Sequence, residues 1–88
     1  MTINDPIPSG VLLVDLRDAK DYHAGHIPGA ARLTLPEIMK KAEKDDVILL
    51  YCYRGKRSAM TARILRLLGY RRAHSVGGID AYKGMLIH

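Results

Sequence analysis

The sequence predicts a small α/β domain in which a central parallel β-sheet is flanked by helices on both faces. Two short segments, residues 11–16 and 47–51, consist almost entirely of apolar residues, which is typical of strands buried on both faces of a parallel sheet. Segments with helical periodicity separate and follow them, and strands that alternate with helices indicate a parallel sheet. The chain of 88 residues is long enough for one domain of this kind.

The chain divides into a short arm and a single folded domain. Residues 1–10 contain Pro6, Pro8 and Gly10, and we expect them to form a loose N-terminal arm. Residues 11–88 carry all the predicted strands and helices and form the domain. We find no internal repeat and no segment of low complexity.

The first half of the domain is predicted to contain two strands and two helices. The apolar run over residues 11–16 predicts a strand that ends at Asp15. Asp18 is a candidate N-cap for a short helix up to Ala24. Gly25 ends that helix, and a loop rich in glycine and proline follows. The sequence then predicts a brief strand over 30–33 and a helix over 35–44 that Thr34 caps.

The second half is predicted to repeat the alternation of strand and helix. Residues 47–51 are the strongest strand candidate, and Cys52 follows at its carboxyl end. An amphipathic helix is predicted over 58–68, and Gly69 ends it. Its buried face is expected to comprise Ala59, Ala62, Leu65 and one or both of Ile64 and Leu68. The remaining elements are a strand over 72–76, a Gly77-Gly78 turn and one or two helical turns over 79–86.

The charge of the chain narrows the class of ligand. Lysine and arginine number 14 against 9 aspartate and glutamate residues, which gives a net charge of +5. Such an excess fits nucleic acid, anionic membranes or small anionic substrates. No aromatic-rich RNA motif accompanies the basic residues, and the longest apolar run, 47–53, is far shorter than the ~20 residues that span a bilayer. We therefore predict small anionic substrates, without nucleic-acid or membrane partners.

The single cysteine sets further limits. Cys52 cannot form an intramolecular disulfide, and a Cys₂ or Cys₄ zinc site is excluded. The four histidines show no tight metal-ligand spacing, so we expect no metal and no cofactor. No signal peptide is visible at the N-terminus, and the sequence predicts a cytoplasmic protein. It carries no indication of oligomeric state.

Cys52 is the candidate nucleophile because of what surrounds it in the sequence. A buried strand delivers it to a short loop, Gly55 gives that loop conformational freedom, and a helix begins immediately afterwards. Backbone N–H groups at the start of a helix favour an anion, and Arg54, Lys56 and Arg57 add positive charge. Such a setting stabilises the thiolate form of cysteine, which is the nucleophile. The alternative interpretation is a buried structural cysteine.

Five segments of the chain resemble the rhodanese family. Residues 52–58, Cys-Tyr-Arg-Gly-Lys-Arg-Ser, resemble the active-site loop of that family. Residues 14–17 and 21–30 resemble its opening signature, which includes His-Ile-Pro-Gly-Ala, and residues 68–70 with 76–79 resemble its closing one. The resemblance covers nearly the whole chain after the first ten residues.

This resemblance implies a single-domain thiosulfate sulfurtransferase. Cys52 matches the cysteine that takes a sulfane sulfur from thiosulfate or another persulfide donor, becomes a persulfide, and passes the sulfur to cyanide or a thiol. A protein partner in a sulfur relay is also implied as possible. The residues that match the substrate-binding loop around the catalytic Cys52 are Tyr53, Arg54, Gly55, Lys56, Arg57 and Ser58.

Three other polar residues are expected to be structural. Asp15 and Arg17 follow the first strand, and His26 lies in the loop after the first helix. Polar groups buried at the base of loops usually bind backbone partners or one another. We therefore expect Asp15 and Arg17 to brace loops through hydrogen bonds and an ion pair, and His26 to hold its own turn.

Two alternative functions follow from the same cysteine loop. Related phosphatases and arsenate reductases need a loop one residue longer, with arginine six positions after the cysteine, whereas that position is Ser58 here and Arg57 is the fifth. The second alternative is a non-catalytic persulfide carrier or docking module that acts with a partner protein.

Tyr82 stands where many family members carry tryptophan, so acceptor specificity is less defined by the resemblance than the fold is.

Overall fold

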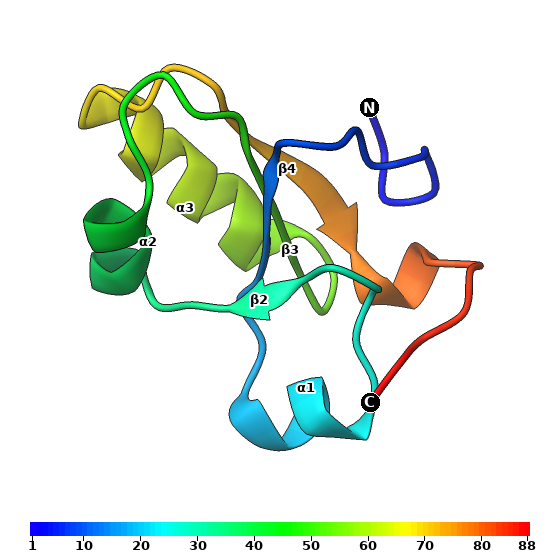
Figure 1. Cartoon of the computed structure of the whole chain (residues 1–88). Coiled ribbons are helices and arrows are strands. Elements are labelled where there is room, and N and C mark those ends of the chain that lie inside the picture. The colour runs from blue at the N-terminus through cyan, green and yellow to red at the C-terminus, as the bar shows by residue number, and fades with distance from the viewer.

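The computed structural model describes residues 1–88, and its centre is a four-stranded parallel sheet. The strands lie in the order β2-β1-β3-β4 (Figure 1). Every neighbouring pair is parallel, which confirms the predicted α/β class. The strands are β1 (Leu12–Asp15), β2 (Ala31–Arg32), β3 (Ile48–Cys52) and β4 (Ala73–Gly78).

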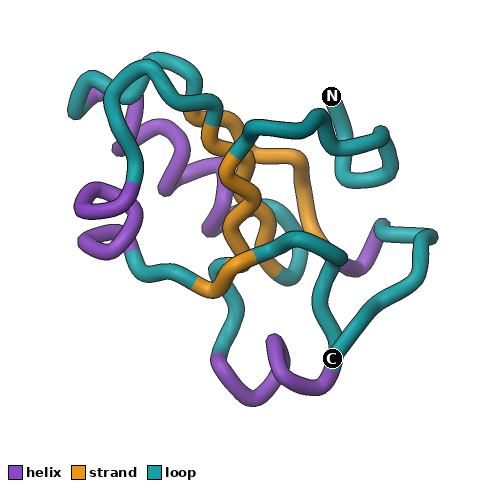
Figure 2. Tube along the Cα trace, viewed as in Figure 1, coloured by secondary structure: helices purple, strands orange, loops and turns teal.

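Four helical segments connect or follow the strands, as the tube in Figure 2 shows. Helices α2 and α3 lie together on one side of the sheet, whereas α1 lies beyond the end of β1 (Figure 1). The segments are α1 (Ala19–Ala24), α2 (Leu35–Lys41), α3 (Lys56–Leu67) and the short 3₁₀ helix η1 (Ile79–Ala81). None of them combines the length and the apolar character that a membrane-spanning helix requires.

β3 is the centre of the core because both of its faces are covered. All five of its residues are buried, as the unbroken apolar run predicts. Ile48 and Leu50 belong to one apolar cluster with residues of α2 and α3. Leu49 and Tyr51 belong to a second cluster on the opposite face. The last residue of β3, Cys52, is thereby held at the carboxyl edge of the sheet.

The two faces of the sheet are covered differently. Helices α2 and α3 cover the first, whereas the second is packed by the N-terminal arm, the loop around Ile27 and the segment from Ile79 to Tyr82. The arm has no helix or strand. We expected it to be loose, but part of it packs against the domain. Ile3 is buried, and the Asn4 side chain donates to the carbonyl of Ala81 and accepts from the N–H of Lys83.

Several element boundaries differ from the prediction. α2 ends at Lys41 instead of residue 44, because Ala42 adopts an extended conformation and packs into the first cluster. Its N-terminus follows the prediction, since Thr34 and Glu37 form a reciprocal capping box. Asp18 stands at the N-cap of α1, but its side chain makes no capping hydrogen bond.

The buried face of α3 was predicted only in part. Ala62 and Leu65 are buried as predicted, together with Ser58, at positions i, i+4 and i+7, whereas Ala59 lies outside this stripe and is exposed. Ile64 and Leu68 are also exposed. The helix begins at Lys56 because Gly55 precedes it in the left-handed conformation, with φ of 97°. A glycine is favoured there, since a side chain would strain this backbone.

The end of the chain also departs from the prediction. Gly77 and Gly78 belong to β4 and not to a turn, and the expected helix over 79–86 is limited to the three residues of η1. Between Leu50 and Tyr51 the register of β3 with β4 shifts: Leu50 pairs with Ser75, and Tyr51 pairs with Gly77. Val76 is therefore the extra residue of a β-bulge beside the carboxyl end of β3.

Candidate functional site

The candidate site is built around the sulfur of Cys52, where β3 ends and the loop to α3 begins. Cys52 is buried, and its Sγ atom lies 3.1 Å from the backbone nitrogen of Gly55 and 3.4 Å from that of Ser58. The hydroxyl oxygen of Ser58 lies 3.5 Å from the same sulfur. Two backbone N–H groups and one hydroxyl thus converge on a single atom.

This convergence changes the acidity of the thiol. Burial alone would raise the pKa of Cys52, because it penalises the charged form. Hydrogen bonds from the Ser58 hydroxyl and from the backbone N–H groups of Ser58, Gly55 and Arg54 outweigh burial, so the pKa of Cys52 is lowered overall. The site therefore favours the thiolate, as the sequence predicts for a nucleophile.

A shallow pocket of about 210 Å³ lies over the sulfur. No carboxylate pairs with the cationic side chains that line it, since the two salt bridges of the molecule lie elsewhere. The guanidinium of Arg57 donates to the carbonyl of Leu16, with a separation of 3.4 Å. The pocket is lined by Cys52, Tyr53, Arg54, Lys56 and Arg57.

The predicted site residues fall into two groups. The backbone of Arg54, Gly55 and Ser58 faces the sulfur, whereas the side chains of Lys56 and Arg57 are exposed at the pocket. Tyr53 lines the pocket as well, but its hydroxyl is engaged with α1: it donates to the carboxylate of Asp21 and accepts from the N–H of Asp18.

Sequence reasoning missed the contribution of β4. The hydroxyl of Ser75 lies 2.7 Å from that of Ser58, and the carbonyl of Gly77 lies 3.3 Å from the Ser58 hydroxyl. Gly78 packs directly against the loop, because a Cβ atom there would overlap the backbone of Tyr53 and Arg54. The available signal was the Gly77-Gly78 pair at the end of a strand, since glycine in a strand often marks close approach of another backbone.

Asp15 and Arg17 form a separate, closed network at the end of β1. Arg17 binds both carboxylate oxygens of Asp15, with Nη2 to Oδ2 at 2.8 Å, and also donates to the carbonyl of Gly25. The hydroxyl of Tyr51 donates to Oδ2 of Asp15 at 2.6 Å and accepts from the N–H of Ile27. This arrangement agrees with the structural role expected for Asp15 and Arg17.

His26 is also occupied within its own turn. Its Nδ1 atom lies 2.9 Å from the carbonyl oxygen of Tyr22, and its ring stacks on that of Tyr22 with the centroids 3.9 Å apart. Nowhere in the structure do three histidine, cysteine or acidic side chains gather as metal ligands would.

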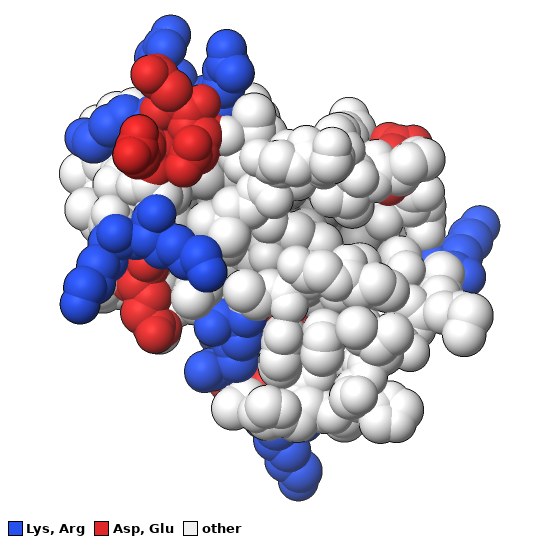
Figure 3. Space-filling view, viewed as in Figure 1, with Lys and Arg blue, Asp and Glu red and all other residues white.

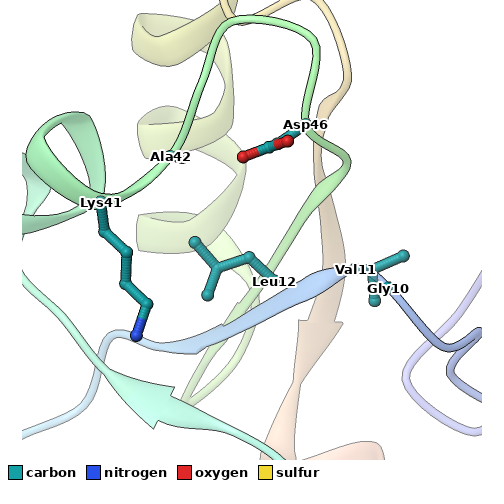
Figure 4. Close-up of a pocket in the computed structure, with 6 residues that line it drawn as sticks. All are labelled: Gly10, Val11, Leu12, Lys41, Ala42 and Asp46. Atoms are coloured by element: carbon teal, nitrogen blue, oxygen red, sulfur yellow. The ribbon is translucent and has the colours of Figure 1, made fainter.

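A larger pocket of about 330 Å³ lies at the opposite end of the molecule (Figure 4). It lies between the start of β1 and the end of α2, and its only charged lining residues are Lys41 and Asp46. Because it holds no nucleophile and lies at the amino end of β1, it is unrelated to the cysteine site. Ligands of parallel sheets bind at the carboxyl ends of the strands, where Cys52 lies.

Comparisons with known proteins show the family of the chain. Residues 3–85 match the family model of the rhodanese-like domain. The chain is 35% identical over 81 residues to thiosulfate sulfurtransferase GlpE of Tolumonas auensis, a match that spans 88% of this chain and 76% of the relative.

Solved structures give the same fold. The crystal structure of SSP1007 from Staphylococcus saprophyticus superimposes with a TM-score of 0.77 at 29% identity, covering 96% of this chain and 86% of that one. The human single-domain sulfurtransferase TSTD1 superimposes with a TM-score of 0.68 at 26% identity, covering 78% and 76%. The chain therefore belongs to the rhodanese-like domain family.

Proposed function

We propose that this protein is a sulfurtransferase that carries sulfur as a persulfide on Cys52, with thiosulfate or another sulfane sulfur compound as donor. The observation that carries the proposal is the set of donors around one sulfur atom, namely two backbone N–H groups and the Ser58 hydroxyl. These groups stabilise a negative charge at the end of β3. They would stabilise the charge of a persulfide in the same way as an oxyanion hole stabilises oxygen.

Sulfur transfer through Cys52 takes two displacement steps at sulfur. The Cys52 thiolate attacks the outer sulfur of thiosulfate, a sulfur–sulfur bond forms, and the bond within thiosulfate breaks. Sulfite leaves with the electron pair of that bond, and the negative charge remains on the outer sulfur of the persulfide. Cyanide or a thiolate acceptor then attacks this outer sulfur and returns Cys52 to its thiolate form.

The pocket suits a small anionic donor. Arg54, Lys56 and Arg57 line its wall without a carboxylate partner, so their charge is available to thiosulfate. The volume of about 210 Å³ accommodates an ion of that size over the sulfur. With Arg57 at the fifth position after Cys52, the loop is one residue shorter than phosphoryl transfer by the related enzymes requires.

The experiment is the transfer of sulfur from thiosulfate to cyanide, measured as thiocyanate formation. We expect turnover by the wild-type protein and none by Cys52→Ser, because Cys52 is the only cysteine. Circular dichroism and urea unfolding of the variant control for loss of the fold. Thiocyanate formation by folded Cys52→Ser, or efficient Cys52-dependent hydrolysis of aryl phosphates by the wild type, would contradict the proposal.

A specific surface favours the second candidate, a persulfide carrier that exchanges sulfur with a protein partner. Met60, Ile64 and Leu67 recur at helical spacing on α3 and are exposed by 66%, 38% and 79%. This apolar stripe begins one turn after the cysteine loop, and α3 has four basic residues and no acidic one. Charged side chains also cluster on the side of the molecule that carries α2 and α3 (Figure 3).

The two candidates differ in the donor they accept. A sulfurtransferase turns over with free thiosulfate, whereas a carrier forms thiocyanate only when a persulfidated protein supplies the sulfur. Comparing the two donors in the same assay separates them. Met60→Glu with Leu67→Glu would impair only the reaction with the protein donor.

A further inference from the structure

A second serine, Ser75, lies beside the site on β4, opposite Leu50 of β3. Ser75 precedes the extra residue Val76, and its Oγ atom lies 2.7 Å from Oγ of Ser58. The N–H of Gly77, the residue after the bulge, donates to Ser75 Oγ at 3.1 Å.

Counting protons favours one direction for this hydrogen-bond chain. Ser75 Oγ accepts from the N–H of Gly77, which leaves the Ser75 proton free to be donated to its neighbour Ser58 Oγ. The Ser58 oxygen has four neighbours besides its own carbon: Ser75, the sulfur of Cys52, and the carbonyls of Gly55 and Gly77. If Ser58 donated to Ser75 instead, neither carbonyl nor the sulfur would receive its proton.

We propose that Ser75 is a positioning residue for the nucleophile: by donating to Ser58, it keeps the Ser58 proton available for the sulfur of Cys52. In the thiol form, the S–H of Cys52 donates to Ser58 and the Ser58 proton goes to a carbonyl. In the thiolate form, the Ser58 hydroxyl rotates and donates to the sulfur. Both states use the same heavy-atom positions, so ionisation requires no movement of the backbone.

Other charged groups near the thiol remain unchanged when Ser75 is altered. Arg54 lies on the loop, and Lys56 and Arg57 lie on α3. The residues of β4 that contact the site carry no charge, Asp80 of η1 has an exposed side chain, and Asp15 of β1 is paired with Arg17. A change of reactivity in a Ser75 variant is therefore attributable to the serine chain.

The test measures the rate at which iodoacetamide alkylates Cys52 as a function of pH. Because the chain has one cysteine, the rate reports that residue alone. Ser75→Ala should move the pH midpoint upward and slow alkylation below the midpoint about threefold, since a donor to a charged network is lost. Ser58→Ala should slow it about tenfold, because it removes the direct donor. Ser75→Thr keeps the hydroxyl and should retain the wild-type midpoint.

A double-mutant cycle separates positioning from a general disturbance of β4. If Ser75 acts through Ser58, then Ser75→Ala leaves the midpoint unchanged in a protein that already carries Ser58→Ala. An equal upward shift in both backgrounds, or an unchanged midpoint in the single Ser75→Ala variant, would overturn the inference. Urea unfolding of each variant establishes that the folded protein is being alkylated.

The role of Ser75 in sulfur transfer rests on the proposed function, but its effect on the thiol does not. Persulfide formation from thiosulfate should slow in Ser75→Ala in parallel with alkylation. If the wild type alkylates as expected and its variants follow the cycle, yet thiosulfate yields no persulfide, then the proposed function fails and the positioning role of Ser75 stands.

Discussion

The carboxyl ends of β1 and β3 lie next to each other in the sheet, but the polar groups there are arranged in opposite ways. At the end of β1, Asp15 and Arg17 satisfy each other, and Tyr51 completes the set. At the end of β3, hydrogen-bond donors converge on Cys52, and the cations of its pocket have no acidic partner.

The pKa shifts at these two strand ends differ in the same way. Burial alone would lower the pKa of Arg17, but its hydrogen bond and ion pair with Asp15 raise it overall, so the arginine stays charged. Burial and the bond to Asp15 raise the pKa of Tyr51, which keeps its hydroxyl protonated. Cys52 has the opposite tendency, since its neighbours favour loss of the proton. A closed network holds loops in place, whereas an excess of donors around one atom prepares it to react.

The largest effect is expected from opening the closed network. Asp15→Asn removes the charge that compensates buried Arg17, and breaking one half of a buried ion pair costs about 3–5 kcal/mol. Urea unfolding should therefore show a large loss in the free energy of unfolding. Alkylation of Cys52 in the fraction that remains folded should keep its wild-type pH midpoint. A stability close to that of the wild type would mean that the network is not a principal brace.

A glycine substitution at the cysteine site should have an intermediate effect. A Cβ atom at Gly78 would overlap the backbone of Tyr53 and Arg54, so Gly78→Ala must displace the loop that holds the sulfur. Overpacking of this kind costs about 1–3 kcal/mol. We expect a rise in the pH midpoint for alkylation and at least a tenfold loss of thiocyanate formation, on the order of a lost oxyanion-hole donor.

Gly29→Ala is the matched control for Gly78→Ala. Gly29 has φ of 87° and open space around its Cα atom, so alanine there strains the backbone without touching the cysteine loop. It should lower stability by about 1 kcal/mol and leave the reactivity of Cys52 unchanged. Equal losses of sulfur transfer in both variants would show that stability alone controls activity.

The smallest effects are expected from the exposed cations. Lys56→Gln and Arg57→Gln each remove one charge at the pocket, and a partly solvated cation contributes about 1 kcal/mol or less. The apparent KM for thiosulfate should rise several-fold per residue at low ionic strength and less at high salt. Lys40→Gln removes the same charge from α2 and should leave the apparent KM for thiosulfate unchanged at low and at high salt. Unchanged kinetics in all three would place the cations outside donor binding.

The contrast between the two strand ends also explains what could be predicted from the sequence. The strands β1 and β3 follow from uninterrupted apolar runs, and the loop after Cys52 follows from the local order of cysteine, glycine and cations. The pairing of Asp15 with Arg17 was expected because polar groups buried at the base of loops usually bind backbone partners or one another. Each of these features depends on neighbours in the chain.

The missed features depend on contacts between distant segments. Ser75 reaches Ser58 through the pairing of β4 with β3, in which Ser75 lies opposite Leu50, and the local sequence does not indicate which residues this pairing brings together. Ile3 is buried because it packs into the apolar cluster on the second face of the sheet, which α2 and α3 do not cover. Ala59 was wrongly assigned to the buried face of α3, because the buried stripe begins with Ser58, where the pattern favours an apolar residue.

The central claim is that the donors at the end of β3 hold a sulfur atom on Cys52, and intact-protein mass spectrometry tests it most directly. After incubation with thiosulfate, the wild-type protein should gain the mass of one sulfur atom, and cyanide should remove it. Cys52→Ser should gain nothing under the same conditions. A wild-type mass that thiosulfate leaves unchanged, or an equal gain in Cys52→Ser, would contradict the account.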